Sequence, residues 1–195
     1  MTEGSRGPDA LGGLPPGLAA LMQEAGQTAK ARPVERWNPP YCGEIDMRIA
    51  ADGAWFYGGT PIGREALVRM FASILRREPD GSHVLVTPVE MVGIAVEDAP
   101  FLAVEMSDDG EGAERVLSFR TNVGDIVAAG PDHPLRYMVE AETGGLKPYI
   151  LVRHGLEALV TRALVHVLVE LAGEADGAAG IWSGGAFFAF PRTAP

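Results

Sequence analysis

The sequence contains few of the residues that build disulfide or metal frameworks. Its 195 residues include one cysteine and four histidines in unlike contexts, so no internal disulfide can form and no Cys/His cluster is present for a zinc site. No apolar run approaches the roughly 20 residues of a membrane span. The first residues lack the basic start and apolar core of a secretory signal. We therefore expect a cytoplasmic protein without a membrane segment, a metal or another cofactor.

Positive charge is scarce as well. The chain has 16 Lys and Arg residues against 26 Asp and Glu, and its formal net charge is −10. A protein that wraps a nucleic-acid polymer needs a basic surface, so this balance argues against that class. Neither the Gly-x-Gly-x-x-Gly pattern of dinucleotide folds nor the phosphate loop of nucleoside triphosphatases is present. A small phosphorylated ligand stays compatible, because two or three local donors are enough to bind it.

What the sequence does contain is the composition of a globular protein, with 22% charged and 47% hydrophobic residues. Its length suits two small units. We expect residues 1–17, rich in Gly and Pro, to be mobile. Residues 18–97 should form a first α+β unit that opens with a helix at Leu18 to Ala25. Residues 98–195 should form a second α+β unit, β-barrel-like with a long helix.

The pattern of the first unit predicts a hairpin covered by a helix. Ile45, Met47 and Ile49 alternate with polar residues, and a turn signal at Asp52-Gly53 precedes an aromatic strand at 55–57. Helical spacing then predicts a helix over residues 64–77, followed by a strand over 84–96 that is interrupted at Pro88 and Gly93.

The second unit is predicted to be mostly strands. Apolar alternation indicates strands at 101–106, 115–121, 126–129, 135–141 and 149–152, a helix over 156–171, and a final hairpin at 181–190. The apolar residues of the two predicted helices align at one constant offset, Ile62 opposite Leu159. This alignment favours an internal duplication with related sheets under the two helices.

Several particular strings occur in order between residues 34 and 191. They are Trp37-Asn38-Pro39-Pro40, Cys42-Gly43, Ile45-Asp46-Met47, Asp52-Gly53 with Trp55 and Tyr57, Pro61-Ile62-Gly63-Arg64, Thr87-Pro88-Val89-Glu90, Glu97-Asp98-Ala99-Pro100, Thr121-Asn122-Val123-Gly124-Asp125, and Trp182-Ser183-Gly184-Gly185 before Phe187-Phe188. In their order and spacing they resemble the bacterial family of domains of unknown function numbered 1285. The resemblance implies an internally duplicated two-domain α+β fold whose second domain is superficially pleckstrin-homology-like. The resemblance implies no enzymatic activity. It implies a site for a nucleotide-like ligand at the domain interface and a role in bacterial signalling under oxidative stress.

Two arginines are candidates for binding an anionic ligand. Arg64 opens the first predicted helix, where the helix dipole favours acidic rather than basic residues, so its placement suggests an anionic partner. Arg153 precedes the second predicted helix and raises the same question. That partner can be a carboxylate of the protein, such as Asp125, or a phosphate of the ligand.

Polar and aromatic residues in the matched strings complete the candidate site. Asp46 shares a strand face with Glu44, and either it contacts a ligand or it pairs with Arg48. Asn122 and Asp125 flank Gly124, where they can converge on a polar ligand or satisfy their own turn. Trp182 and Ser183 can stack a base and hold a phosphate, whereas a core tryptophan beside a glycine turn is the alternative.

The leading hypothesis is a non-enzymatic protein that binds a small anionic, nucleotide-like ligand and takes part in signalling with a signalling protein as partner. The absence of standard catalytic motifs favours it, although the sequence leaves enzyme activity open. One alternative is an enzyme that uses Cys42 as a nucleophile or Asp46 as an acid or base. The other is a protein-interaction module, which a large exposed apolar patch would indicate.

Overall fold

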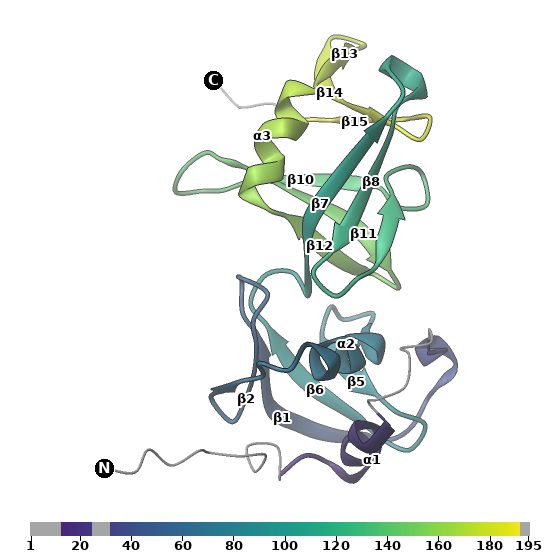
Figure 1. Ribbon diagram of the computed structural model, residues 1–195, viewed down its shortest axis with the longest axis vertical. Helices are drawn as coiled ribbons and strands as arrows, with labels where there is room; N and C mark the ends of the chain where they lie inside the picture. The colour runs from purple at the N-terminus through teal and green to yellow at the C-terminus, as the bar shows by residue number, and fades with distance from the viewer. Residues whose placement is uncertain (1–12, 25–31, 192–195) are drawn as a thin grey trace. The chain divides into compact units, whose positions relative to one another are not determined.

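The computed structural model describes residues 13–24 and 32–191. The chain divides into two units, Met1–Asp98 and Ala99–Pro195, and each combines β-sheets with helices (Figure 1). This confirms the predicted α+β class. Most of the segment predicted to be mobile, residues 1–12, lies outside the described residues. No helix in the described part of the chain is long and apolar enough to cross a membrane.

The first unit contains one six-stranded sheet with the order β3-β2-β1-β6-β5-β4. Its strands are β1 (Tyr41–Ile49), β2 (Trp55–Tyr57), β3 (Thr60–Pro61), β4 (Leu75–Arg77), β5 (His83–Val86) and β6 (Met91–Val96). Neighbouring strands are antiparallel except β1 and β6, which run parallel. The sheet therefore consists of two antiparallel three-stranded halves joined at one parallel pair.

The predicted hairpin is formed by β1 and β2. Ile49 pairs with Trp55 across a turn in which Gly53 has a φ of 80°, a conformation that favours glycine. Met47 and Ile49 are buried and Asp46 is exposed, as the alternation predicts. The predicted hairpin and its buried face are confirmed.

Two helices pack on this sheet, α1 (Pro16–Glu24) and α2 (Glu65–Ser73). Phe71 of α2 stacks on Trp55 of β2 with ring centroids 6.2 Å apart, and both side chains are fully buried. Leu18 of α1 is buried, and its amide donates a 3.0 Å hydrogen bond to the buried Glu90 carboxylate. An acidic group at a helix N-terminus is favoured by the helix dipole, so Glu90 fixes α1 to the unit.

The helix predicted over residues 64–77 is shorter than expected. It ends at Ser73, whose hydroxyl donates to the Met70 carbonyl at 2.6 Å, and the chain continues as β4. Leu75 is buried and pairs with Leu85 of β5. A buried leucine suits either structure, and the tertiary pairing with β5 overrides the helical spacing.

The second unit contains a six-stranded sheet and a three-stranded sheet, ordered β10-β11-β12-β7-β8-β9 and β13-β14-β15. The strands are β7 (Phe101–Asp109), β8 (Val116–Thr121), β9 (Ile126–Ala128), β10 (Leu135–Val139), β11 (Leu146–Arg153), β12 (Leu156–Val160), β13 (Gly173–Ala175), β14 (Ala178–Ser183) and β15 (Ala186–Ala189), with helix α3 (Arg162–Glu170) between β12 and β13. The larger sheet is open, with β10 and β9 at its edges. Its pleckstrin-homology-like character stays a prediction.

The long helix predicted over residues 156–171 is wrong in its first third. Leu156, Ala158 and Val160 are buried and alternate with half-buried residues, so this part is strand β12. The helix that follows has 9 residues and begins at Arg162. The first residue of the helix is therefore Arg162. Arg153, which was expected to precede the helix, is instead the last residue of β11.

The two six-stranded sheets share one topology. In the second unit β7 and β12 form the parallel pair, and all other neighbours are antiparallel, so β7–β12 repeat the order of β1–β6. The helices do not follow this repeat, because α2 lies between the third and fourth strands of its sheet whereas α3 follows the sixth. The shared topology supports a duplicated architecture. The alignment that places Ile62 opposite Leu159 does not relate the two sheets, because the helices occupy different places in the repeat.

Ser183 joins the two sheets of the second unit. Its hydroxyl donates to the Ala129 carbonyl at 2.8 Å and accepts from the Leu117 amide at 2.9 Å, and the residue is fully buried. The next residue, Gly184, has a φ of 56°, and a Cβ atom there would lie 2.6 Å from the Ala129 carbonyl oxygen. The Ser-Gly pair is thus required for this close approach.

Replacing Ser183 by Ala should lower the free energy of unfolding by about 1–3 kcal/mol, because a buried amide and a buried carbonyl would both lose a partner. Urea unfolding of the purified protein measures this loss. Ser107→Ala, at an exposed position of β7, is the matched control and should change stability by no more than about 0.5 kcal/mol. Equal effects of the two substitutions would contradict the role assigned to Ser183.

Candidate functional site

Two of the predicted ligand residues, Asp46 and Arg64, are exposed in the first unit. Arg48 pairs with Glu97, not with Asp46, and its guanidinium lies 4.3 Å from the centroid of Phe56. Arg64 is the N-cap residue of α2, and the described residues form no ion pair with it. An anion can therefore bind Arg64 without displacing an ion-pair partner. The assignment of Asp46 and Arg64 to a ligand site stays a prediction.

Three predicted residues of the second unit come together at the end of its larger sheet. The Asn122 side chain accepts from the Leu102 amide at 3.0 Å, so it continues the pairing between β7 and β8. The Asp125 carboxylate forms an ion pair with Arg153, whose guanidinium lies 4.8 Å from the centroid of Phe101. An anionic ligand would have to compete with Asp125 for Arg153.

Trp182 and Ser183 lie elsewhere in the second unit. Ser183 contacts Leu117 near the start of β8, whereas Asn122 follows the end of β8. Five residues of extended chain separate Leu117 from Asn122 by roughly 17 Å. Trp182 is half-buried and packs on Phe187 with ring centroids 5.1 Å apart. The Ser183 hydroxyl already donates to the Ala129 carbonyl and accepts from the Leu117 amide, so Ser183 is not part of the site proposed below.

Cys42, the nucleophile of the enzyme alternative, is exposed on β1 with its sulfur 3.6 Å from the Pro40 carbonyl oxygen. His166 is exposed as well. Its place on α3 puts it on the rim of a cleft rather than in the core.

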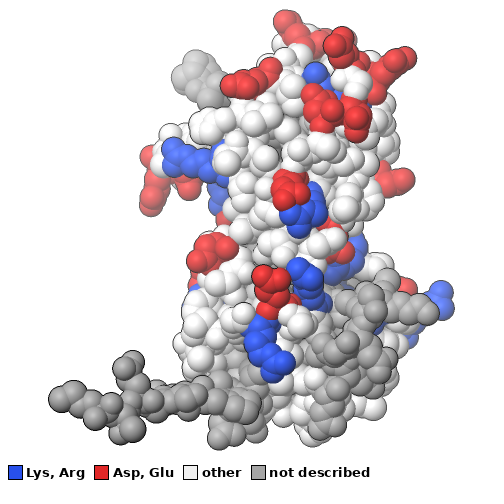
Figure 2. Space-filling view, viewed as in Figure 1, with Lys and Arg blue, Asp and Glu red and all other residues white. Residues whose placement is uncertain are grey.

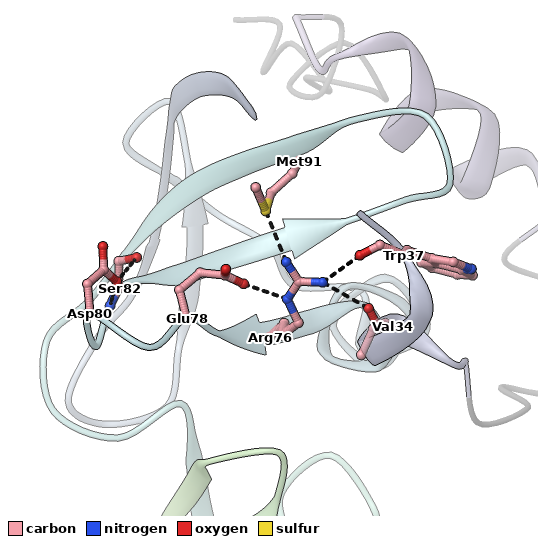
Figure 3. Close-up of polar contacts among 7 residues, drawn as sticks. All are labelled: Val34, Trp37, Arg76, Glu78, Asp80, Ser82 and Met91. Atoms are coloured by element: carbon pink, nitrogen blue, oxygen red, sulfur yellow. Dashed lines mark hydrogen bonds and ion pairs between the residues drawn. The ribbon is translucent and has the colours of Figure 1, made fainter. Parts of the chain in front are cut away.

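Arg76 organises the start of the first unit (Figure 3). Its guanidinium donates to the carbonyl oxygens of Val34 and Trp37, at 3.0 and 2.7 Å, and pairs with Glu78 at 2.5 Å. A further contact joins it to the Met91 sulfur at 3.2 Å. Arg76 thereby fixes the chain that leads through the Trp37-Asn38-Pro39-Pro40 string into β1.

One cleft of about 550 Å³ lies on the first unit, and its lining is acidic. It includes Glu44, Glu78 and Asp80 together with His83 and the exposed Tyr41. Hydrogen bonds from Ser82 hold the pKa of Asp80 below its usual value, so this carboxylate stays ionised. In the described part of the chain no three His, Cys, Asp or Glu side chains are placed to hold a metal ion. The acidic lining disfavours an anionic ligand here.

A second cleft, of about 390 Å³, lies within the second unit. It is formed by the hairpin of β10 and β11, the end of β12 and the first turns of α3. The lining residues are Glu140, Thr143, Gly145, Leu146, Lys147, Leu159, Val160, Arg162, Val165 and His166. Arg162 and His166 are four residues apart on α3, so they lie on one face of the helix. The hydroxyl of Thr143 is already donated to Glu140.

The second cleft gathers basic side chains in an otherwise acidic protein. Figure 2 shows acidic residues concentrated over the end of the second unit that carries β13 and the 3₁₀ helix Gly112–Glu114. The cleft instead combines Lys147, Arg162 and His166 with one carboxylate, that of Glu140. Arg162 occupies the end of α3 where the helix dipole favours acids. An anion bound here would therefore be stabilised by the Arg162 guanidinium and by the dipole.

Comparison with known families identifies the chain's relatives. Residues 32–99 match the N-terminal domain of a family described as a domain of unknown function, DUF1285, and residues 100–190 match its C-terminal domain. The chain belongs to the DUF1285 family. No curated protein matches it.

Two solved structures of DUF1285 proteins resemble this chain. One, from Silicibacter pomeroyi DSS-3, is 50% identical with a TM-score of 0.81, and the match covers 87% of this chain and 93% of that one. The other, from Shewanella baltica OS155, is 28% identical with a TM-score of 0.51, and the match covers 65% of this chain and 91% of that one. Both support the architecture described above.

Sequence reasoning missed the three basic residues of the second cleft. The helix was expected to begin at residue 156, so Arg162 was predicted to lie inside it. The argument that a cation at the start of a helix binds an anion was therefore applied to Arg153. Lys147 follows a turn signal at 143–145, which indicates a hairpin but does not show what the hairpin faces. A correct boundary between β12 and α3 would have identified Arg162.

His83, which lines the acidic cleft, should make stability depend on pH. Burial, with a smaller contribution from the charge of Arg77, holds the pKa of His83 below 6.5. The unfolded chain therefore takes up the proton first, and the folded state loses stability as the pH falls below about 6.5. His83→Gln should reduce the loss of unfolding free energy between about pH 7 and pH 5.

The pKa itself can be measured by NMR titration of the His83 ring. Arg77→Gln is the matched variant, because it removes the smaller cause and leaves the burial, so the pKa should rise part of the way towards 6.5. A wild-type value at or above 6.5 would contradict the prediction.

Proposed function

We propose that this DUF1285 protein binds a small anionic ligand in the cleft of its second unit and catalyses no reaction on it. The observation that carries the proposal is that Lys147, Arg162 and His166 all line one cavity of about 390 Å³. This volume lies within the range of small-molecule sites, and charged groups in a cavity fix the head of a ligand while apolar groups surround its body. Charge-assisted hydrogen bonds are the strongest that such a lining offers.

A role in signalling, which the family resemblance implied, is kept as part of the proposal, and nucleotide-like molecules are among the ligands to be tested. The ligand site expected between the two units stays a prediction, as do the assigned contacts of Asp46, Arg64, Asn122, Asp125, Arg153 and Trp182.

A thermal-shift screen followed by calorimetry tests the proposal. The panel contains inorganic phosphate, nucleotides, phosphorylated metabolites and carboxylates, and a ligand at 100 times its dissociation constant adds about 2.7 kcal/mol of stability. Arg162→Gln should weaken binding of the best ligand by about 1.5–3 kcal/mol, which is tenfold or more, because a charge-assisted hydrogen bond is lost.

Two control variants separate the cleft from other cations. Arg36→Gln removes an exposed charge of the first unit and should leave affinity unchanged. Arg64→Gln tests the site predicted from the sequence. Binding that is lost in Arg64→Gln and kept in Arg162→Gln would move the site to α2, and no saturable shift with any anion would refute the proposal.

A further inference from the structure

The walls of the second cleft are aliphatic. Besides Lys147, Arg162 and His166 it is lined by Leu146, Leu159, Val160 and Val165, and in the described part of the chain no Phe, Tyr or Trp side chain contributes to this lining. The nearest ring in sequence, Tyr149, is covered on its face by the guanidinium of Arg136 at 4.2 Å. The cleft thus combines basic side chains that are exposed or half-buried with aliphatic side chains that are half-buried or buried.

This lining discriminates between kinds of anion. Proteins that bind a nucleobase stack it on planar side chains and pair its polar edges. The planar groups of this lining are the His166 ring and the Arg162 guanidinium, and an anionic head group bound by them leaves neither to stack a base. Apart from His166 and the charged side chains, the polar side chain of the lining is Thr143. Its hydroxyl is donated to Glu140 and accepts from the Gly145 amide at 3.0 Å. Little is left to hydrogen-bond a base edge or a sugar ring, and burying these groups unpaired would cost affinity.

We propose that the ligand of this cleft is an aliphatic monocarboxylate. Its carboxylate would lie between Arg162, His166 and Lys147, where a guanidinium can bind both oxygens, and its hydrocarbon chain would pack on Leu146, Leu159 and Val165. Each methylene removed from water strengthens binding about fourfold. This inference rests on the proposed function and names the chemical class of its ligand.

Calorimetry on the full chain with a homologous series tests it. Acetate, hexanoate, octanoate and decanoate are compared with inorganic phosphate and adenosine monophosphate. We expect the dissociation constant to fall about fourfold per methylene until the cleft is filled, and octanoate to bind more tightly than adenosine monophosphate.

Matched variants locate the chain and the head group. Val165→Asn should weaken octanoate binding tenfold or more and leave acetate binding unchanged, whereas Arg162→Gln should weaken both. Val167→Asn is the control, because it makes the same change on the same helix at an exposed residue outside the lining. The chain-length series on the unchanged protein decides the question even where Val165→Asn fails to fold.

The failures are distinguishable. If phosphate or adenosine monophosphate binds more tightly than octanoate and Arg162→Gln abolishes that binding, the inference is overturned while the proposed function stands. Octanoate binding that responds equally to Val165→Asn and Val167→Asn also overturns the inference. If none of the anions binds, the inference and the proposed function fail together.

Discussion

A single parallel strand pair holds each unit together. In the first unit β1 lies beside β6, and in the second β7 lies beside β12, so the first strand of the sheet meets the last and the two antiparallel halves become one sheet. Antiparallel neighbours need only a tight turn, but a parallel pair requires the chain to return over a longer path. All the intervening strands are that path, which is why neither half can be placed without the other.

The position of the helix relative to this return path decides what each unit can do. In the first unit α2 lies within the path, between β3 and β4, and its Phe71 covers Trp55, so the helix closes the core. In the second unit the path contains no α-helix, and α3 follows β12 directly. Its first turn therefore lies against the β10–β11 hairpin, and the space between them is the basic cleft. One sheet topology thus carries a helix within its return path in one unit, and in the other a helix that follows the path and borders a basic cleft.

The strands and turns were readable from the sequence because their signals are local. Asp52-Gly53 specifies a hairpin by its backbone preference, and the alternation of Met47 and Ile49 fixes which face is buried. The helix boundaries were not readable. The segment of β12 satisfies both the helical and the strand period, and what decides between them is pairing with β7, a partner more than fifty residues away. Boundary errors of this kind then moved the expected anion-binding arginine from Arg162 to Arg153.

The candidate site was harder to predict than the fold, and the reason lies in what the matched strings do. Ser183 ties two sheets together, Asn122 extends a strand pairing, and Glu90 holds α1, so these polar residues satisfy backbone groups that would otherwise be buried unpaired. The basic residues of the cleft lie outside every such string. At these three positions the strings that reveal the family serve its architecture. A ligand preference, in contrast, depends on exposed cations and aliphatic walls, which no backbone constraint dictates and which can be read only after the strands are placed.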